Sequence, residues 1–204
     1  RLRPKPVQQP HPPIWMAALS PETFEIAGRY GLNLLFGAVF GLSPEAAKLR
    51  RVDYYRGLRA GGHSFEGRSS GCLNMVYVAD TMERAREEFR DAVLWYYRTI
   101  AKYIAPDKGQ KAVKGDEMYT AFRDLASVAD WEMLLEREAV ICGSPDYVTE
   151  RLHGFQQTYG FTDLLCWTRL GGLDHRKVLR SMELMRDKVI PRLRDSQPPP
   201  PPAL

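Results

Sequence analysis

Short, nearly continuous apolar runs alternate along the chain with longer stretches in which apolar residues recur every three or four positions. A short apolar run is typical of a strand that is buried on both faces of a parallel sheet. Four such runs are predicted to be strands, at residues 14–19, 32–37, 74–79 and 162–167. The stretches between them have the spacing of amphipathic helices. The pattern therefore predicts an α/β fold in which parallel strands are joined by right-handed helical crossovers.

A serine-proline-acid triplet occurs three times, at residues 20–22, 43–45 and 144–146. Serine is a preferred helix N-cap, because its hydroxyl accepts a hydrogen bond from an amide of the first turn. Proline suits the first helical position, and an acid in that turn meets the positive end of the helix dipole. Each triplet therefore predicts the start of a helix. After the first and the third, the helix is followed by Tyr-Gly and then by a run containing Leu-Leu, which indicates a repeated β/α unit.

Three further helical stretches are predicted. A long helix begins after Asp80 or Thr81 and ends before Pro106, because proline cannot continue a helix. A second stretch covers residues 117–137, and Asp174 caps the last helix. The apolar stripe of the long helix is formed by Met82, Ala85, Phe89, Val93, Tyr96, Ile100 and Tyr103. Before the third strand, a looser segment is expected around Gly57, Gly61, Gly62, Gly67 and Gly71.

Four strands with intervening helices fit either an open doubly wound sheet or half of an eight-stranded β/α barrel. Neither a GxGxxG nor a GxxxxGK[ST] phosphate loop follows any predicted strand, so the sequence does not favour the open sheet. Half a barrel has two unpaired strand edges and one uncovered face, so it should need the missing half. We expect residues 1–13 to be an extended Pro-rich connector, 14–193 the half-barrel, and 194–204, which contain QPPPPPAL, a disordered tail. The opening RLRPKP, without a methionine, suggests a fragment.

Composition and charge exclude several classes of function. Hydrophobic residues make up 44% of the chain and charged residues 26%, with a net charge of +4, as in an ordinary globular domain. The basic residues are scattered among acids, which argues against nucleic-acid binding. The longest apolar stretch, LNLLFGAVFGL, is too short to span a membrane. Cys72, Cys142 and Cys166 form no CxxC pair, so we expect no metal site and no disulfide framework, but buried thiols in a reducing compartment, the cytoplasm.

Several segments resemble the bacterial luciferase-like, flavin-dependent monooxygenases. They are PHPPIWMAALSPETFEIAGRYGLNLLFG, VYVADTMERAREE, WYYRTIAKYIAP, ICGSPDYVTERL and GGLDHRKVLRSMELMRDKVIPRL, and they keep the family's order over Pro10–Leu193. The resemblance implies a luciferase-like (β/α)8 TIM barrel about twice as long as this chain, which would carry only its C-terminal half, with four strands. It also implies an enzyme that uses reduced FMN and dioxygen on a small organic substrate, and that forms a homodimer or heterodimer when complete.

Two alternatives to that function stay open. One is a non-catalytic structural subunit or paralogue that keeps the barrel and pairs with an active chain. The other is an oxidoreductase of the sister branch, which uses a deazaflavin for hydride transfer. The resemblance places the catalytic histidine of some members in the absent N-terminal half, so no catalytic residue is predicted here.

The candidate site residues lie at the C-terminal ends of the predicted strands, where barrel enzymes hold their active sites. Ala18 and Ser20 follow the first strand, and Ser20 and Thr23 place two hydroxyls at a helix N-terminus, which favours an anion. The resemblance implies that this serine and threonine contact the flavin phosphate, although Leu19 stands where bacterial luciferase has glutamate. Plain helix capping is the alternative for Ser20, and it accounts for Ser43 and Ser144.

The flavin ring and the substrate are expected at the neighbouring strand ends. Gly37 would let the ring approach the backbone, and Phe36 and Trp167 could line the ring or substrate pocket. Core packing is the alternative for both aromatic residues. His175 follows the last strand and could face the same pocket.

Overall fold

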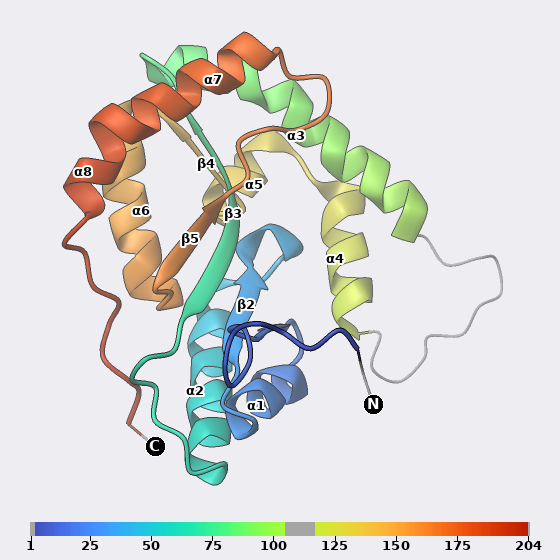
Figure 1. Cartoon of the computed structure of the whole chain (residues 1–204). Helices are drawn as coiled ribbons and strands as arrows, with labels where there is room; N and C mark the ends of the chain where they lie inside the picture. Colours follow the sequence, from blue (N-terminus) through green and yellow to red (C-terminus); the bar gives the residue numbers. More distant parts are fainter. Residues whose placement is uncertain (1–2, 105–116, 204) are drawn as a thin grey trace, which may run out of the picture.

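The computed structural model describes residues 3–104 and 117–203, and it forms one parallel β-sheet with helices on both faces (Figure 1). The strands of the described chain are β1 (Trp15–Ala17), β2 (Asn33–Gly37), β3 (Ser70–Val78), β4 (Val140–Gly143) and β5 (Asp163–Cys166). Every pairing between them is parallel. The predicted α/β class and strand direction are therefore confirmed.

Strand β3 is the centre of the sheet and pairs along two different stretches. Its first half, around Gly71–Leu73, pairs with β2 on one edge and with β5 on the other. Its second half, Met75–Val78, pairs with β4. The predicted set of four strands was incomplete, because β4 is only four residues long and was not recognised ahead of the third triplet. Strand β3 also begins earlier than residue 74, because the small residues from Ser70 onwards resemble a loop in sequence.

The serine of each triplet caps a helix as predicted. The hydroxyl of Ser20 accepts a hydrogen bond from the amide of Thr23 at 3.3 Å, and Ser43 and Ser144 make the same contact with the third residue after them. The helices are α1 (Pro21–Arg29), α2 (Pro44–Ala60), α3 (Met82–Ile104), α4 (Glu117–Val128), α5 (Trp131–Glu136), α6 (Pro145–Tyr159), α7 (His175–Leu184) and α8 (Ile190–Leu193). A short 3₁₀ turn, η1 (Ala38–Phe40), follows β2, and a π-helical turn, η2 (Met185–Val189), joins α7 to α8.

Two helix predictions needed correction. The segment that was expected to be loose contains α2, and Gly57 lies inside that helix while Gly71 lies inside β3. The helical stretch predicted over 117–137 is divided into α4 and α5, because Asp130 caps a new helix and accepts a hydrogen bond from the amide of Met133 at 3.0 Å.

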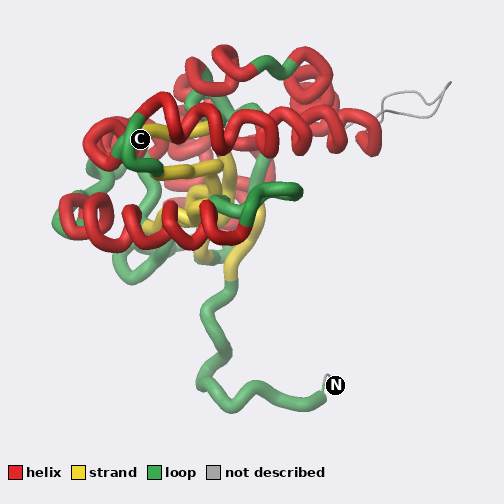
Figure 2. The backbone as a smooth tube through the Cα atoms, turned by 90° about the horizontal axis from the view of Figure 1, so that it is seen from above, coloured by secondary structure: helices red, strands yellow, loops and turns green. Residues whose placement is uncertain are grey.

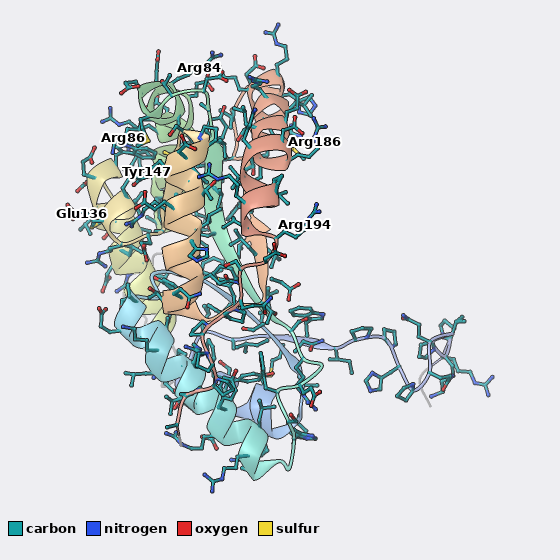
Figure 3. All side chains as sticks on the ribbon, turned by 90° about the vertical axis from the view of Figure 1, so that its left-hand side faces the viewer. Arg84, Arg86, Glu136, Tyr147, Arg186 and Arg194 are labelled. Carbon is teal, nitrogen blue, oxygen red and sulfur yellow. The ribbon has the colours of Figure 1, made fainter. Side chains whose placement is uncertain are left out.

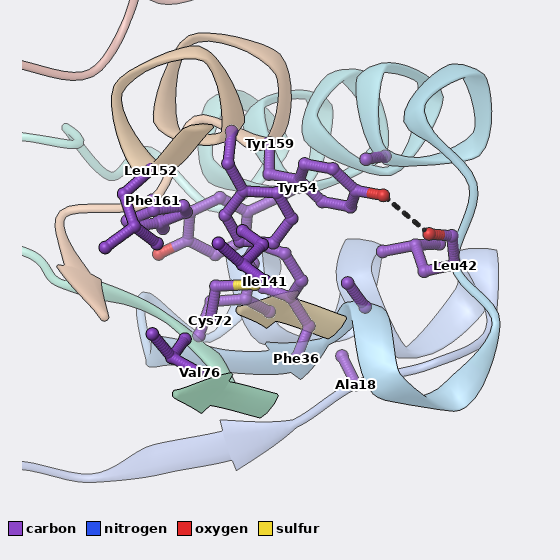
Figure 4. Packing of buried hydrophobic residues seen from close by; sticks show 14 of the residues in the cluster. Ala18, Phe36, Leu42, Tyr54, Cys72, Val76, Ile141, Leu152, Tyr159 and Phe161 are labelled. Carbon is purple, nitrogen blue, oxygen red and sulfur yellow. Dashed lines mark hydrogen bonds between the residues drawn. The ribbon is translucent and has the colours of Figure 1, made fainter. Parts of the chain in front are cut away.

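Helices cover the two faces of the sheet at different heights. Helices α1, α2 and α6 cover one face, where Phe36 and Cys72 pack with Tyr54 and Tyr159 in one hydrophobic cluster (Figure 4). The hydroxyl of Tyr159 donates to the carbonyl of Leu42 at 2.9 Å, which ties α6 to the start of α2. Helices α3, α4 and α5 cover the other face beside the second half of β3. There the ring of Tyr77 stacks on that of Phe89, with 4.8 Å between centroids.

On that second face, the part beside the first half of β3, around Gly71, is open. A Cβ atom on Gly71 would contact side-chain atoms of Trp15, Leu35 and Leu165, so these three side chains converge on the uncovered side of the sheet. Trp15 is 41% exposed and Leu165 38%. Within the described residues, β1 pairs only with β2 and β5 only with β3, so each leaves an outer edge. An open apolar face between two free parallel edges is the geometry of part of a barrel.

We expect the 204-residue chain, purified on its own, to dimerise or aggregate and to show no flavin-dependent oxygenation. Unpaired edges and an exposed apolar face favour self-association. Sedimentation velocity and a turnover assay on the same sample measure both properties. A monomeric chain that is active by itself would contradict the half-barrel interpretation.

The cysteines differ in exposure. Cys72 and Cys142 are buried, and burial raises the pKa of the Cys142 thiol to about 12, so it stays protonated near neutral pH. Cys166 is exposed, contrary to the expectation of three buried thiols, because it lies in the edge strand β5. In the part of the chain that the structure describes, no group of His, Cys, Asp and Glu is placed to hold a metal ion. None of its described helices is long and apolar enough to cross a membrane.

The two ends of the chain lie outside the sheet. Residues 3–13 are exposed and extend away from the folded part (Figure 2 and Figure 3). After α8 the chain runs down beside α6 towards α2 (Figure 1). The domain boundaries given above remain predictions.

Candidate functional site

The N-terminus of α1 is fixed to the sheet by the residues that follow β1. The amide of Ala18 donates to the carbonyl of Leu35 in β2 at 2.8 Å, and Ala18 is buried. The next amide, that of Leu19, donates to Thr23 Oγ1 at 3.2 Å. Ser20 is the N-cap of α1, in an extended conformation. The structure therefore brings Ala18, Ser20 and Thr23 together at the carboxyl end of β1, as the sequence predicts.

The two hydroxyl groups at this terminus have different hydrogen-bonding capacity left. Thr23 Oγ1 donates its proton to the carbonyl of Ser20 at 2.8 Å, so that proton is used within the turn. Ser20 Oγ accepts from the amide of Thr23 and lies 3.3 Å from Thr23 Oγ1. Because the Thr23 proton is used, Ser20 is the donor of this contact, and at 3.3 Å it is longer than an ordinary O–H···O hydrogen bond, so the Ser20 proton is held weakly and can turn to another acceptor.

The pKa of Glu22 reports on the donors at this helix N-terminus. Hydrogen bonds from its own backbone amide and from the Ser20 hydroxyl hold the pKa of the Glu22 carboxyl below its usual value. The side chain lies at the surface in the first turn of α1, where the helix dipole also favours negative charge. The N-terminus of α1 therefore carries donors that favour negative charge on an oxygen atom. Glu22 was interpreted from the sequence only as a complement to the helix dipole.

Gly37 lies at the carboxyl end of β2, beside the predicted site. A Cβ atom at this position would lie 3.0 Å from the ring of Phe40 and 3.3 Å from the carbonyl of Leu73. The ring of Phe40, in the η1 turn that follows the strand, thus lies so close to the backbone that position 37 requires a small residue. Phe40 was not among the predicted site residues.

Phe36 lies on the opposite face from the predicted pocket. Its side chain is buried among the helices that cover β2, and its ring centroid is 5.8 Å from that of Phe24 in α1. Side chains of adjacent strand residues point to opposite faces, so Leu35, and not Phe36, faces the open side of the sheet. Core packing, which the sequence left open as the alternative, accounts for Phe36.

Trp167 and His175 lie beyond the carboxyl end of β5. In the register of β5 with β3, Leu165 is opposite Leu73, so Trp167 continues on the open face. Its ring meets that of Tyr96 from α3 edge-on at 4.9 Å, and its Nε1 donates to the carbonyl of Arg169 at 2.9 Å. His175 is the first residue of α7 and is exposed. Among the described contacts, neither residue touches the N-terminus of α1.

The sequence profile of the luciferase-like monooxygenases matches residues 1–162. The chain belongs to the luciferase-like monooxygenase family. The expected family is therefore confirmed. The expected fold is confirmed with it, and this chain forms a part of that barrel.

One similar protein has a named activity. The oxygenase component of the flavin-dependent trigonelline monooxygenase of Acinetobacter baylyi is 25% identical over 197 residues, which are 95% of this chain and 52% of that protein. The chain thus spans about half the length of the relative that it matches.

Solved structures share the fold. The oxygenating constituent of 3,6-diketocamphane monooxygenase from Pseudomonas putida, solved in complex with FMN, aligns with a TM-score of 0.67 and 20% identity over 89% of this chain and 49% of that one. The coenzyme F420 dependent tetrahydromethanopterin reductase of Methanopyrus kandleri aligns with a TM-score of 0.58 and 18% identity over 88% of this chain and 50% of that one. At these identities the likeness concerns the fold.

Proposed function

We propose that the chain is the C-terminal half of the barrel of a flavin-dependent monooxygenase, an oxidoreductase that uses reduced FMN and dioxygen on a small organic substrate. The observation that carries the proposal is the position of the N-terminus of α1 at a strand end of a luciferase-like barrel, where Ser20 and Thr23 place two hydroxyl groups beside the amides of the first turn. Membership of the family and the flavin-dependent relative support it.

In this proposal the phosphate of the flavin lies at the N-terminus of α1. Ser20 Oγ donates to a phosphate oxygen, and the amide of Glu22 is the second donor. The carboxylate of Glu22 has to turn away into solvent, because it would otherwise compete with the phosphate for the same donors. Thr23 positions Ser20, since its own hydroxyl proton is held by the carbonyl of Ser20. The hydrogen bond from the Ala18 amide to β2 fixes the position of the site relative to the sheet.

The remaining residues would shape the space above the phosphate. Gly37 lacks a side chain at the end of β2, and a planar ring could approach the backbone there if the ring of Phe40 turned away. Trp167 closes the far side of the open face together with Tyr96, and His175 borders it from the start of α7. The flavin supplies the oxygen-activating chemistry when it is bound, and the protein supplies orientation and a pocket that excludes water. The catalytic residues belong to the half of the barrel that this chain lacks.

Two other functions remain candidates. A deazaflavin-dependent oxidoreductase is supported by the alignment with the coenzyme F420 dependent reductase. A non-catalytic structural subunit would keep the sheet and the caps without binding a flavin. In either monooxygenase or reductase form, we propose a homodimer or heterodimer of complete barrels.

Binding and oxygen consumption in the whole protein separate these functions. We expect the whole protein to bind FMN more tightly than a deazaflavin, measured by flavin fluorescence, and its complex with reduced FMN to consume dioxygen, measured with an oxygen electrode. Tighter binding of the deazaflavin would support the reductase. A protein that binds neither compound would be the structural subunit.

A further inference from the structure

The proline-rich end of the chain lies against the helical layer formed by α2 and α6. Arg51 in α2 donates through one nitrogen, Nη2, to the carbonyls of Pro199 and Pro200, at 3.2 and 3.0 Å. Gln157 in α6 donates through Nε2 to the carbonyl of Gln197 at 2.8 Å. All three contacts therefore run from a side-chain donor on the helices to a backbone acceptor of the tail.

This direction of hydrogen bonding matches the chemistry of polyproline. A proline residue has no amide proton, so its carbonyl is its only backbone hydrogen-bonding group. Consecutive prolines form the polyproline II helix, which has no internal hydrogen bonds and leaves those carbonyls available. A surface that binds such a segment has to supply donors, and here α2 and α6 supply them.

The burial of the tail has the period of a polyproline II helix. Ser196, Pro199 and Pro202, which are spaced three apart, are half-buried, as is Pro198 beside them, whereas Pro200 and Pro201 are exposed. A polyproline II helix has three residues per turn, so residues three apart lie on one side. One side of the segment thus faces α2 and α6 along its length.

The backbone at Gly160 holds the side chain of Arg51 in position for this contact. Gly160, the αL cap of α6 with φ +68°, leaves space that the guanidinium fills, since a Cβ atom there would lie 2.2 Å from Arg51 Nε and 2.6 Å from Cζ. Burial raises the pKa of neighbouring Tyr55, and the charge of Arg51 opposes that rise, so the two side chains are also close. A positioned donor loses less entropy when it binds a ligand than a mobile one does.

We propose that residues 196–202 form a polyproline II strap and that α2 and α6 provide its binding surface, in which Arg51 and Gln157 bind the carbonyls of the tail. The strap begins directly after α8, where Ser196 donates to Gln156 Oε1 and lies 3.2 Å from His153 Nδ1. It fastens the last helix of the chain to α6 and α2, on the side of the sheet away from the open face. The proposal differs from the disorder expected for residues 194–204, and it does not depend on the proposed function.

A spin label on the tail tests the strap. Ala203→Cys in a Cys166→Ser background gives one accessible thiol among the described residues, because Cys72 and Cys142 are buried. We expect the nitroxide to show an immobilised component in its electron paramagnetic resonance spectrum, whereas a free terminus moves on the nanosecond timescale. Arg51→Ala should lose that component, and Arg59→Ala, the matched removal of a guanidinium from the last turn of α2, should keep it.

The mobility of the label in these variants can support or overturn the strap. A label that is fully mobile while Arg51 is present would overturn it, as would a label that stays immobilised in the Arg51→Ala, Gln157→Ala double variant. Circular dichroism checks that each variant is folded. If Arg51→Ala does not fold, Gln157→Ala alone carries the test, and an unchanged spectrum in that variant would also overturn the strap.

Discussion

Gly57→Ala is expected to lower the free energy of unfolding by about 3 kcal/mol, the upper part of the range for forcing an extra carbon into a packed core. The new Cβ would lie 2.2 Å from the carbonyl oxygen of Glu25 and 3.0 Å from the amide nitrogen of Arg29, both in α1. Gly28 makes the reciprocal contact, since its Cβ would lie 2.2 Å from the carbonyl oxygen of Tyr54 in α2. Backbone atoms cannot rotate away as a side chain can, so α1 and α2 would have to separate.

The matched control is Gly154→Ala in α6. This glycine is also inside a helix, but a Cβ atom there would have no heavy atom within 4 Å. Alanine should therefore raise the free energy of unfolding by about 0.5–1 kcal/mol through its higher helix propensity. Denaturant unfolding of the three proteins measures both changes. Equal effects of the same sign at Gly57 and Gly154 would show that the contact between α1 and α2 is not as close as described.

What the sequence predicts well in this protein is local. The three triplets start helices because a serine cap, a proline and an acid act within one turn, so each signal is complete in a few residues. Strand β4 escaped prediction because it is only four residues long, and the first half of β3 because its small residues resemble a loop in sequence. Gly57 indicated a loop, but in the structure its missing side chain serves the contact of α2 with α1.

In the candidate site, too, the local features were predicted and those that depend on the folded geometry were not. Ser20 and Thr23 could be placed from the sequence, because a strand, a cap and a helix follow one another directly there. Phe36 could not be assigned to a face, because a shift of one residue in a strand exchanges the two faces of a sheet. The lowered pKa of Glu22 required the geometry, since it depends on how the side chain lies relative to the donors of the first turn.

Ser20→Ala in the whole protein is expected to weaken the binding of FMN by about 1.5–3 kcal/mol, the value of a hydrogen bond to a charged group. The variant loses the Ser20 hydroxyl, whose proton is held within the turn only by the long 3.3 Å contact with Thr23 Oγ1. Riboflavin has the same ring system without the phosphate, so its affinity should barely change. The loss of the cap alone costs about 1 kcal/mol of stability and does not distinguish the two ligands.

Ser144→Ala is the control for capping. It removes the same kind of N-cap from α6, where the hydroxyl accepts from the amide of Tyr147 at 3.4 Å and where we propose no phosphate. The affinities of this variant for FMN and for riboflavin should both equal those of the unaltered protein.

Titration calorimetry of FMN and riboflavin with the unaltered protein and with Ser20→Ala tests most directly whether the N-terminus of α1 binds the flavin phosphate. The account predicts that the substitution weakens the binding of FMN at least tenfold, which is about 1.4 kcal/mol, and leaves the binding of riboflavin unchanged. Equal losses for the two flavins, or no loss for either, would show that Ser20 only caps a helix, as Ser43 and Ser144 do.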